Sequence, residues 1–361
     1  MMRWLYVCTL AMAVVCWSAG LAMAAGRPAI LFCGSVDRDY LRELQEKGFE
    51  VDYTESLSEV TWERISKFNV LVIFGTPDAY AVVYGGEKSS PERVRGFVDL
   101  IERYLEAGGG VLLLPMEMNV IKQMVADLTD NWGARVPCEI IAEADPDKTA
   151  ALTHSNQGTP LAFTDQILPS PVSEGVRGVW YPNQPAYNGA MTLPLILDEN
   201  WQVVVRASQT ATTKPVDLSK AATPLPDPLV RTEPETAPPI FAIRTYKSGR
   251  IAFACQWPQF SVGAGTKWIY NREVLERGVK GRPSDFGRLL ENTFRWLAEP
   301  SLQTGALGGH VTSAERLLPP NAREEVKREY KGYEERYWPY DPKELDKYEL
   351  PAGLKLYRGL L

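Results

Sequence analysis

The sequence predicts an α/β fold, a three-layer αβα sandwich whose doubly wound, mostly parallel sheet is flavodoxin-like. Two observations predict it. Apolar residues run continuously in 69-NVLVIFG-75 and 110-GVLLLP-115, as is typical of strands buried on both faces of a sheet. These runs alternate with amphipathic segments of helical period, such as 92-ERVRGFVDLIERYLEAG-108, which would cover both faces. Folds of this class bind ligands at the carboxyl ends of the strands.

The first 24 residues have the pattern of a secretory signal peptide. Arg3 precedes a long apolar run, and Ala22-Met23-Ala24 gives the small-x-small pattern of a cleavage site. An uncleaved N-terminal membrane anchor is the alternative interpretation. We expect cleavage after Ala24, a secreted or periplasmic protein, and no membrane contact after cleavage, since no later segment has the roughly 20 apolar residues of a membrane span.

Composition narrows the class of protein further. With 45% hydrophobic and 23% charged residues, the 361-residue chain can bury a sizeable core. Its net charge of −6, or −7 once Arg3 is removed, argues against nucleic acid as a partner. Cys33, Cys138 and Cys255 remain after cleavage, too few and too far apart for a disulfide framework. Since the sequence has no CxxC, HExxH or acidic calcium loop, we expect neither a metal nor a cofactor.

The first half of the chain predicts strands and helices in alternation. Each apolar run between turn residues predicts a strand, over residues 28–34, 50–54, 69–75, 110–115 and 136–144. Amphipathic segments predict helices over 37–50, 61–67, 92–108 and 119–133, with 76–90 as a loop. Pro91 is placed to open the long helix.

The second half is less regular. Strands are predicted at 176–182 and 201–208, and a hairpin with strands 240–246 and 250–257 turns at 247–249. Seven prolines between 214 and 239 predict an extended, mobile excursion. The last helix, 284–300, should be capped by Ser284 or Asp285 and stopped by Pro300.

These elements predict one α/β domain over residues 25–300, followed by a charged linker or arm over 301–361. Residues 321–361 are charged, aromatic and punctuated by proline. One interpretation is a solvated helical arm followed by an extended tail. The other is a docking arm for a partner domain or subunit.

The order of elements resembles the class I glutamine amidotransferase-like superfamily, near its trehalose-utilisation-type branch. The resemblance covers residues 27–300 and is carried by four stretches: 69-NVLVIFGTP-77, 106-EAGGGVLLLP-115, 248-SGRIAFACQW-257 and 293-TFRWLAEPS-301. Catalysts of that family need a Cys nucleophile at the turn after the fourth strand and a His after the last hairpin strand.

Both catalytic groups are missing from the matching positions. The first turn carries Pro115-Met116-Glu117, and a thioether cannot be deprotonated to a nucleophile. The second carries Cys255-Gln256-Trp257 with no His. The only two histidines, His154 and His310, lie in a polar loop and beyond the predicted core. The resemblance therefore implies a retained fold without amidotransferase chemistry.

Three carboxylates follow predicted strands and are the candidate catalytic residues. Asp37, Asp78 and Glu117 would meet at one edge of such a sheet, where two of them could act as acid and base on a sugar or bind a hard cation. Asp37 and Asp78 could equally cap the following turns. Glu117 has no evident capping role and is the best single candidate.

Aromatic and amide side chains mark the candidate binding loops. The stretch 180-WYPNQPAYNG-189 and the residues after the hairpin combine ring faces with planar hydrogen-bonding groups, as saccharide sites do; core packing would explain Trp180 and Trp257 equally well. The predicted ligand-binding residues are Met116, Glu117, Tyr181, Asn183, Gln184, Gln256, Trp257 and Trp268.

Three functions are compatible with these patterns. The first is a secreted, catalytically silent amidotransferase-like domain that binds a ligand, with a saccharide as the first class to test, or that supports a partner domain. The second is a carbohydrate-active hydrolase or isomerase using Glu117 with Asp37 or Asp78. The third is a structural envelope protein that assembles through the 321–361 arm.

Overall fold

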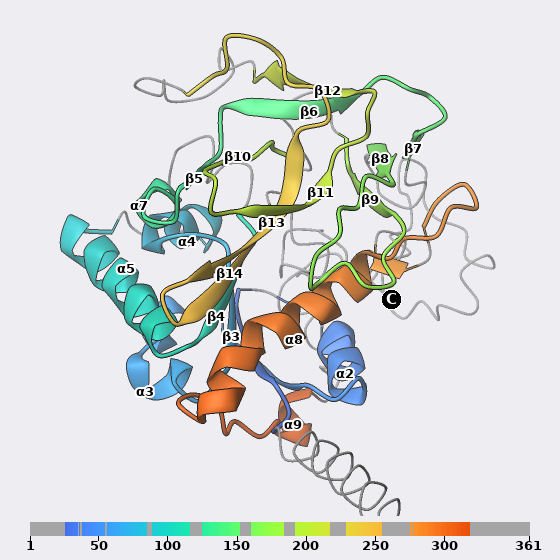
Figure 1. The fold of residues 1–361 in the computed structure, drawn as a ribbon. Coiled ribbons are helices and arrows are strands. Elements are labelled where there is room, and N and C mark those ends of the chain that lie inside the picture. The colour runs from blue at the N-terminus through green and yellow to red at the C-terminus, as the bar shows by residue number, and fades with distance from the viewer. Residues whose placement is uncertain are drawn as a thin grey trace, which may run out of the picture.

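The computed structural model describes residues 26–317, except 35, 37, 55, 85–88, 116–124, 152–159, 184–191, 217–228, 255–274 and 277. These residues form a three-layer α/β sandwich around a mostly parallel seven-stranded sheet (Figure 1). The fold class predicted from the apolar runs is confirmed.

The central sheet has the strand order β11-β13-β14-β4-β3-β1-β2. Its strands are β1 (Ala29–Cys33), β2 (Glu50–Thr54), β3 (Val70–Ile73), β4 (Gly110–Leu113), β11 (Gln202–Arg206), β13 (Pro239–Tyr246) and β14 (Gly249–Ala254). The run from β2 to β14 is parallel. The hairpin strand β13 and the edge strand β11 add two antiparallel pairings.

Both faces of the parallel strands are buried, which is why their sequences are continuously apolar. In β1, Ile30 and Phe32 pack on one face, while Leu31 and Cys33 pack on the other. Successive side chains of a strand point to opposite faces. The alternation therefore divides one apolar run between two separate cores.

Helices form the two outer layers (Figure 1). One face carries α2 (Arg38–Glu46) and the long α8 (Phe286–Thr304), with α9 (Ala314–Leu317) beside α2. The opposite face carries α3 (Trp62–Ile65), α4 (Pro77–Tyr84), α5 (Pro91–Glu106) and α7 (Ala126–Thr129). A single 3₁₀ turn, η1 (Leu57–Glu59), precedes α3.

The three glycines before β4 let two helices approach the sheet. Gly108 has a φ of +88° and ends α5 in the left-handed region. A Cβ at Gly109 would meet the ring of Tyr104, and one at Gly110 would meet Leu297 of α8. The stretch therefore serves close packing on both sides of β4.

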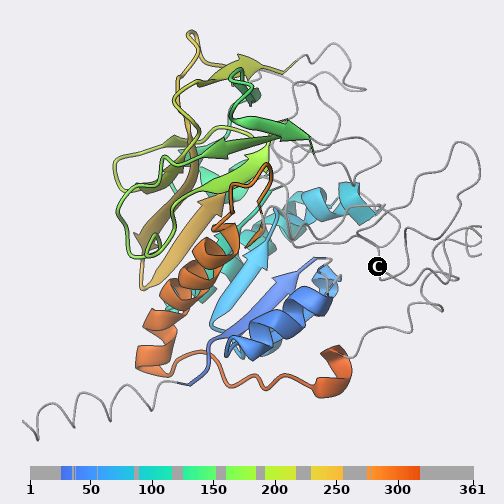
Figure 2. The same ribbon diagram turned by 90° about the vertical axis from the view of Figure 1, so that its right-hand side faces the viewer.

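A long insertion separates β4 from β13 and forms small antiparallel sheets. Its strands are β5 (Ala134–Arg135), β6 (Glu139–Glu143), β7 (Thr149–Ala151), β8 (Pro160–Thr164), β9 (Val179–Pro182), β10 (Ile196–Leu197) and β12 (Ala211–Pro215). They pair as β12-β6, β7-β8-β9 and β10-β5. Figure 2 shows these strands gathered beyond one end of the parallel strands.

Two predicted boundaries differ from the structure. The 76–90 loop contains the helix α4, which Pro77 opens. The expected stop at Pro300 is wrong, because α8 continues to Thr304 and ends at Gly305 in the left-handed region. Pro300 has no N–H for the carbonyl of Trp296, one turn earlier.

That carbonyl of Trp296 has another donor. Arg250 Nη1 of β14 donates to Trp296 O at 2.5 Å and forms an ion pair with Glu299 at 2.6 Å. Its guanidinium also lies 4.8 Å from the centre of the Trp296 ring. The arginine donates to the carbonyl that the proline leaves unpaired, and the helix continues beyond the proline.

The proline-rich excursion predicted over 214–239 contacts the rest of the fold at both of its described ends. Lys214 and Pro215 lie in β12, paired with β6. Arg231 forms an ion pair with the buried Glu139 at 2.7 Å, and Pro239 begins β13. Residues 217–228 lie outside the described residues.

Candidate functional site

The two loops that carry catalysts in amidotransferases leave the sheet side by side. β4 and β14 are adjacent and parallel, with Leu113 paired to Phe253 at their carboxyl ends. The chain then continues into Met116 and Glu117 from one strand, and into Gln256 and Trp257 from the other. These four residues and Trp268 lie outside the described residues, so their roles stay predictions.

The strands preceding the three candidate carboxylates end at one edge. β1, β3 and β4 are adjacent and parallel. Asp37 and Glu117 lie outside the described residues. Asp78 lies in the first turn of α4, where its Oδ1 accepts from the main-chain N–H of Ser89 at 2.6 Å. This carboxylate therefore ties α4 to the start of α5.

Two predicted binding residues are buried and packed. Tyr181 is fully buried, and its side chain belongs to the core beside α8. Asn183 accepts from Glu143 N at 2.8 Å and donates to Glu143 O at 3.4 Å. Asn183 therefore joins β9 to β6. Gln184 lies outside the described residues.

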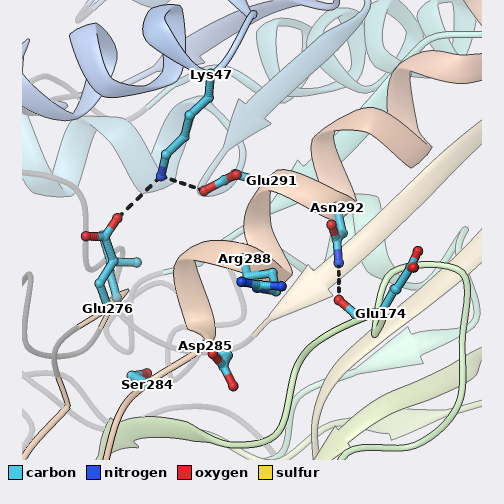
Figure 3. Close-up of a pocket in the computed structure, with 9 residues that line it drawn as sticks. Lys47, Glu174, Glu276, Ser284, Asp285, Arg288, Glu291 and Asn292 are labelled. Carbon is cyan, nitrogen blue, oxygen red and sulfur yellow. Dashed lines mark hydrogen bonds and ion pairs between the residues drawn. The ribbon is translucent and has the colours of Figure 1, made fainter.

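A cavity of about 530 Å³ lies between the end of α2, the loop that contains Glu174 and the first turns of α8 (Figure 3). Most of its lining side chains are polar or charged. The residues that line the cavity are Lys47, Glu174, Leu275, Glu276, Ser284, Asp285, Arg288, Glu291 and Asn292. Leu275 and Ser284 are buried.

Several of these polar groups are held in place. Lys47 Nζ lies 2.6 Å from Glu291 Oε1 and 3.3 Å from Glu276 Oε1. Burial would lower the pKa of Lys47, but the hydrogen bonds and negative charges of Glu291 and Glu276 outweigh it and raise that pKa. Asn292 Nδ2 donates to Val172 O at 3.0 Å, which leaves its Oδ1 as an acceptor.

Arg288 lies in the middle of these groups (Figure 3). Within the described ranges no hydrogen bond or ion pair engages its guanidinium. Its Nη1 would lie 2.6 Å from a Cβ at Gly175, whose φ is +70°. A glycine at 175 therefore leaves the room that the guanidinium occupies.

The cavity suits a ligand whose groups both donate and accept. Arg288 offers only donors, whereas the carboxylates of Glu276, Asp285 and Glu291 offer acceptors. A hydroxyl group can accept a hydrogen bond from Arg288 and donate one to a carboxylate, so a polyhydroxylated ligand fits this lining better than an anion or a cation alone. Neither Cys nor His is among the described lining residues.

Sequence patterns did not identify this cavity, because its residues come from three separate segments. One signal was present. Ser284, Arg288 and Glu291 recur at helical spacing on one face of the last predicted helix. That face is polar where the rest of the helix is apolar.

The described cysteines are structural. Burial raises the pKa of the Cys33 thiol to about 12, and the main-chain carbonyl of Cys33 accepts from Tyr80 Oη at 2.5 Å. Cys138 is buried too, and burial raises its pKa. Across the described residues no group of three His, Cys, Asp or Glu side chains could hold a metal ion. None of the described helices has the length and apolarity to cross a bilayer.

Comparison with known proteins gives a fold likeness only. No family model matches the sequence, and no curated protein shows significant similarity to it. Among solved structures, the chain is similar to the mmIFT52 N-terminal domain, with 13% identity, 74% of this chain and 97% of that chain covered, and a TM-score of 0.45.

Two further structures resemble the chain. A cytoplasmic protein from Salmonella typhimurium has 13% identity, with 74% of this chain and 98% of that chain covered, and a TM-score of 0.39. A GMP synthase-type protein from Thermoplasma acidophilum has 9% identity, with 77% of this chain and 98% of that chain covered, and a TM-score of 0.36. Likenesses of this size carry no argument about function, and the fold class rests on the sheet topology itself.

Proposed function

We propose that this chain is a ligand-binding domain of amidotransferase-like fold that lacks amidotransferase chemistry, and that its ligand is a saccharide. The observation that carries the first part is the adjacency of β4 and β14. Their loops begin with Pro115-Met116-Glu117 and Cys255-Gln256-Trp257. The first lacks the Cys nucleophile and the second lacks the His that amide hydrolysis in that family would need there.

The cavity supports the choice of ligand class. Arg288 is unpaired among the described residues, and Lys47 contacts both Glu291 and Glu276. A sugar presents several hydroxyl groups that both donate and accept hydrogen bonds, so it can use these groups at once. The aromatic and amide residues predicted at 256–268 favour the same class, whereas Trp180, Tyr181 and Asn183 are buried and add no support.

The test is a thermal-shift screen of the full chain against mono- and oligosaccharides and divalent cations. A ligand at about 100 times its dissociation constant should add roughly 2.7 kcal/mol to the free energy of unfolding. We expect a saccharide to raise the melting temperature, and the Arg288→Met variant to lose that shift. Arg95→Met, an exposed change on the opposite helix layer, is the matched control and should keep it.

Loss of the shift in Glu117→Ala, but not in Arg288→Met, would place the saccharide at the carboxyl edge of the sheet instead. No shift with any sugar would contradict the proposed ligand class. It would favour support of a partner domain, which truncation of 318–361 and a pull-down with the full chain would then address.

The second candidate is a carbohydrate-active enzyme. The adjacency of β1, β3 and β4 favours it, because the loops carrying Asp37, Asp78 and Glu117 start from neighbouring strands. This candidate predicts turnover of a glycan that Glu117→Gln abolishes with no loss of stability. Binding without turnover in the wild-type chain would argue against it.

Secretion and assembly through the arm are separate parts of the proposal. Mass spectrometry of the protein recovered from its native host should find Ala25 as the first residue. An intact Met1, or recovery only from the cytoplasm, would contradict secretion. Salt-sensitive oligomers that disappear on truncation of 321–361 would favour a structural envelope role.

A further inference from the structure

The edge strand β2 is covered by the chain that follows α8. An edge strand presents unpaired N–H and C=O groups to solvent. Two main-chain hydrogen bonds join the ends of β2 to the β1 side: Glu50 N donates to Pro28 O, and Gly34 N donates to Thr54 O. Val51 and Tyr53 therefore face outward. Residues 308–317, here called the strap, lie along this outer side.

Thr312 and Arg316 fasten the strap to β2. Val51 N donates to Thr312 Oγ1 at 2.7 Å, and Thr312 N donates to Glu50 Oε2 at 2.8 Å. Arg316 Nη2 donates to Tyr53 O at 2.7 Å, and its guanidinium lies 4.3 Å from the centre of the Tyr53 ring. The strap thus occupies main-chain groups that a neighbouring strand would use.

His310 holds the other end of the strap. Its N–H donates to Lys67 O at 3.0 Å, and its ring stacks on Phe68 with centroids 4.5 Å apart. The imidazole also hydrogen-bonds the main chain of Val51. Its Nε2 is buried with no partner in the described structure, so a second proton on the ring would have no acceptor.

Several charges face this end of the strap. Asp52 and Glu50 of β2 favour protonated His310, whereas Arg64 of α3 opposes it. Burial is the largest effect and leaves the pKa of His310 lowered from 6.5. Arg316 of the strap is engaged by Asp52 at 2.8 Å.

Glu50 adds a second titrating contact. Burial would raise its pKa, but the hydrogen bonds from Thr312 and the nearby charge of Arg27 outweigh that effect and lower it from 4.5. Because the pKa values of Glu50 and His310 are both lowered while the strap is attached, each group holds fewer protons in the attached state than in the released state. Attachment is therefore strongest above pH 6.5 and weakens as the pH falls, first through His310 and then through Glu50.

We propose that the strap is an acid-releasable cover of the sheet edge. Proton uptake by His310 and Glu50 detaches residues 308–317 and exposes the outward main-chain groups of Val51 and Tyr53 to solvent. This device is independent of the saccharide ligand proposed above.

The experiment is hydrogen–deuterium exchange of the full chain at about pH 5 and about pH 8, the range over which histidine changes charge, with rates corrected for intrinsic exchange. We expect peptides covering β2 and the strap to lose protection several-fold at the lower pH. A peptide covering β4 should keep its protection. Simultaneous loss in β4 would mean global unfolding and would overturn the proposal.

Two variants separate the causes. His310→Gln keeps a donor for Val51 but does not titrate, so the loss of protection should move to lower pH, where only Glu50 acts. An unchanged pH dependence in this variant would overturn the proposal.

Thr312→Val should expose the Val51 amide already at the higher pH. Full protection there would show that the strap does not guard β2, which would also overturn it.

Discussion

At the scale of single residues, a proline inside a helix is compensated by an arginine from a neighbouring strand. Pro300 leaves Trp296 O without its helical donor, and Arg250 supplies one. An unpaired buried carbonyl costs about 1–3 kcal/mol, and Trp296 O is partly buried, so this contact stabilises the continuation of α8 to Thr304. The arginine and the proline are therefore energetically coupled.

We expect Arg250→Met to lower the free energy of unfolding by about 1–3 kcal/mol. Adding Pro300→Ala to that variant should recover about 1 kcal/mol, because the new main-chain N–H at position 300 can donate to Trp296 O within the helix. Urea unfolding followed by circular dichroism measures both. Pro300→Ala alone is the control that completes the cycle, and strictly additive effects would contradict the coupling.

Cys33 gives a second prediction at this scale. Burial raises the pKa of its thiol from 9.0 to about 12, so the folded protein keeps this thiol protonated where the unfolded chain ionises it. The contribution of Cys33 to stability is complete below pH 9 and is lost as the pH rises from 9 toward 12. Iodoacetamide at mildly alkaline pH, read by peptide mass mapping, should label Cys33 only after denaturant is added. Rapid labelling of the folded chain would contradict this.

At the scale of elements, a buried ion pair joins three segments of the insertion. The side chain of Glu139 in β6 is 2% exposed, and Arg231 contacts it at 2.7 Å. Arg231 also reaches Leu195 O at 3.2 Å and Glu235 at 2.7 Å. One arginine therefore joins β6, the segment before β10 and the chain returning toward β13.

Arg231→Met should cost about 3 kcal/mol, since it leaves the buried carboxylate of Glu139 without its cation. Arg231→Met combined with Glu139→Gln should cost less than Arg231→Met alone, because the buried charge is then removed as well. Arg95→Met, which breaks an exposed pair with Glu92, is the matched control and should cost under about 1 kcal/mol. Equal costs for Arg231→Met and Arg95→Met would contradict the role assigned to burial.

The sequence predicts elements well where one physical signal dominates. Continuous apolar runs located β1, β3 and β4, and Pro91 located the start of α5. The structure adds the cap of that helix, because Ser90 Oγ accepts from Arg93 N. The short insertion strands, such as β5 and β10, are stabilised by pairing partners distant in the sequence, which no local pattern reveals.

The candidate site was predicted less completely, for a similar reason. Loop composition identified Tyr181 and Asn183 as polar and aromatic residues after a strand, but burial depends on the neighbours that tertiary structure brings. The cavity around Arg288 depends on Gly175 and Lys47, which are far from it in the chain. Helical spacing places its α8 residues together and says nothing of what faces them.

At the scale of the whole molecule, packing continues past the boundary predicted at residue 300. Ser301 Oγ accepts from Asn69 Nδ2 at 2.9 Å, and Leu307 and Leu317 are buried. Asn69 also donates to Leu307 O and accepts from Ala29 N. The turn after α8 is thus joined to the start of β1 and β3.

We expect truncation after Leu317 to leave the melting temperature unchanged and truncation after Pro300 to lower it. Loss of the burial of Leu307 alone should cost about 2 kcal/mol. Differential scanning calorimetry of the two truncated chains beside the full chain measures this. Equal melting temperatures for all three would mean that residues 301–317 add nothing to the fold.

The insertion between β4 and β13 has a consequence for how the protein is made. β4 leaves the ribosome well before β14, its neighbour in the sheet, because the whole insertion is translated between them. Until residue 254 emerges, the nascent sheet ends at β4, an apolar strand with one open side. Pairing strands so distant in sequence is slow, and an open apolar edge attracts other chains meanwhile. We therefore expect the yield of folded protein to depend on the speed of translation through the insertion and on chaperones that shield β4 during that interval.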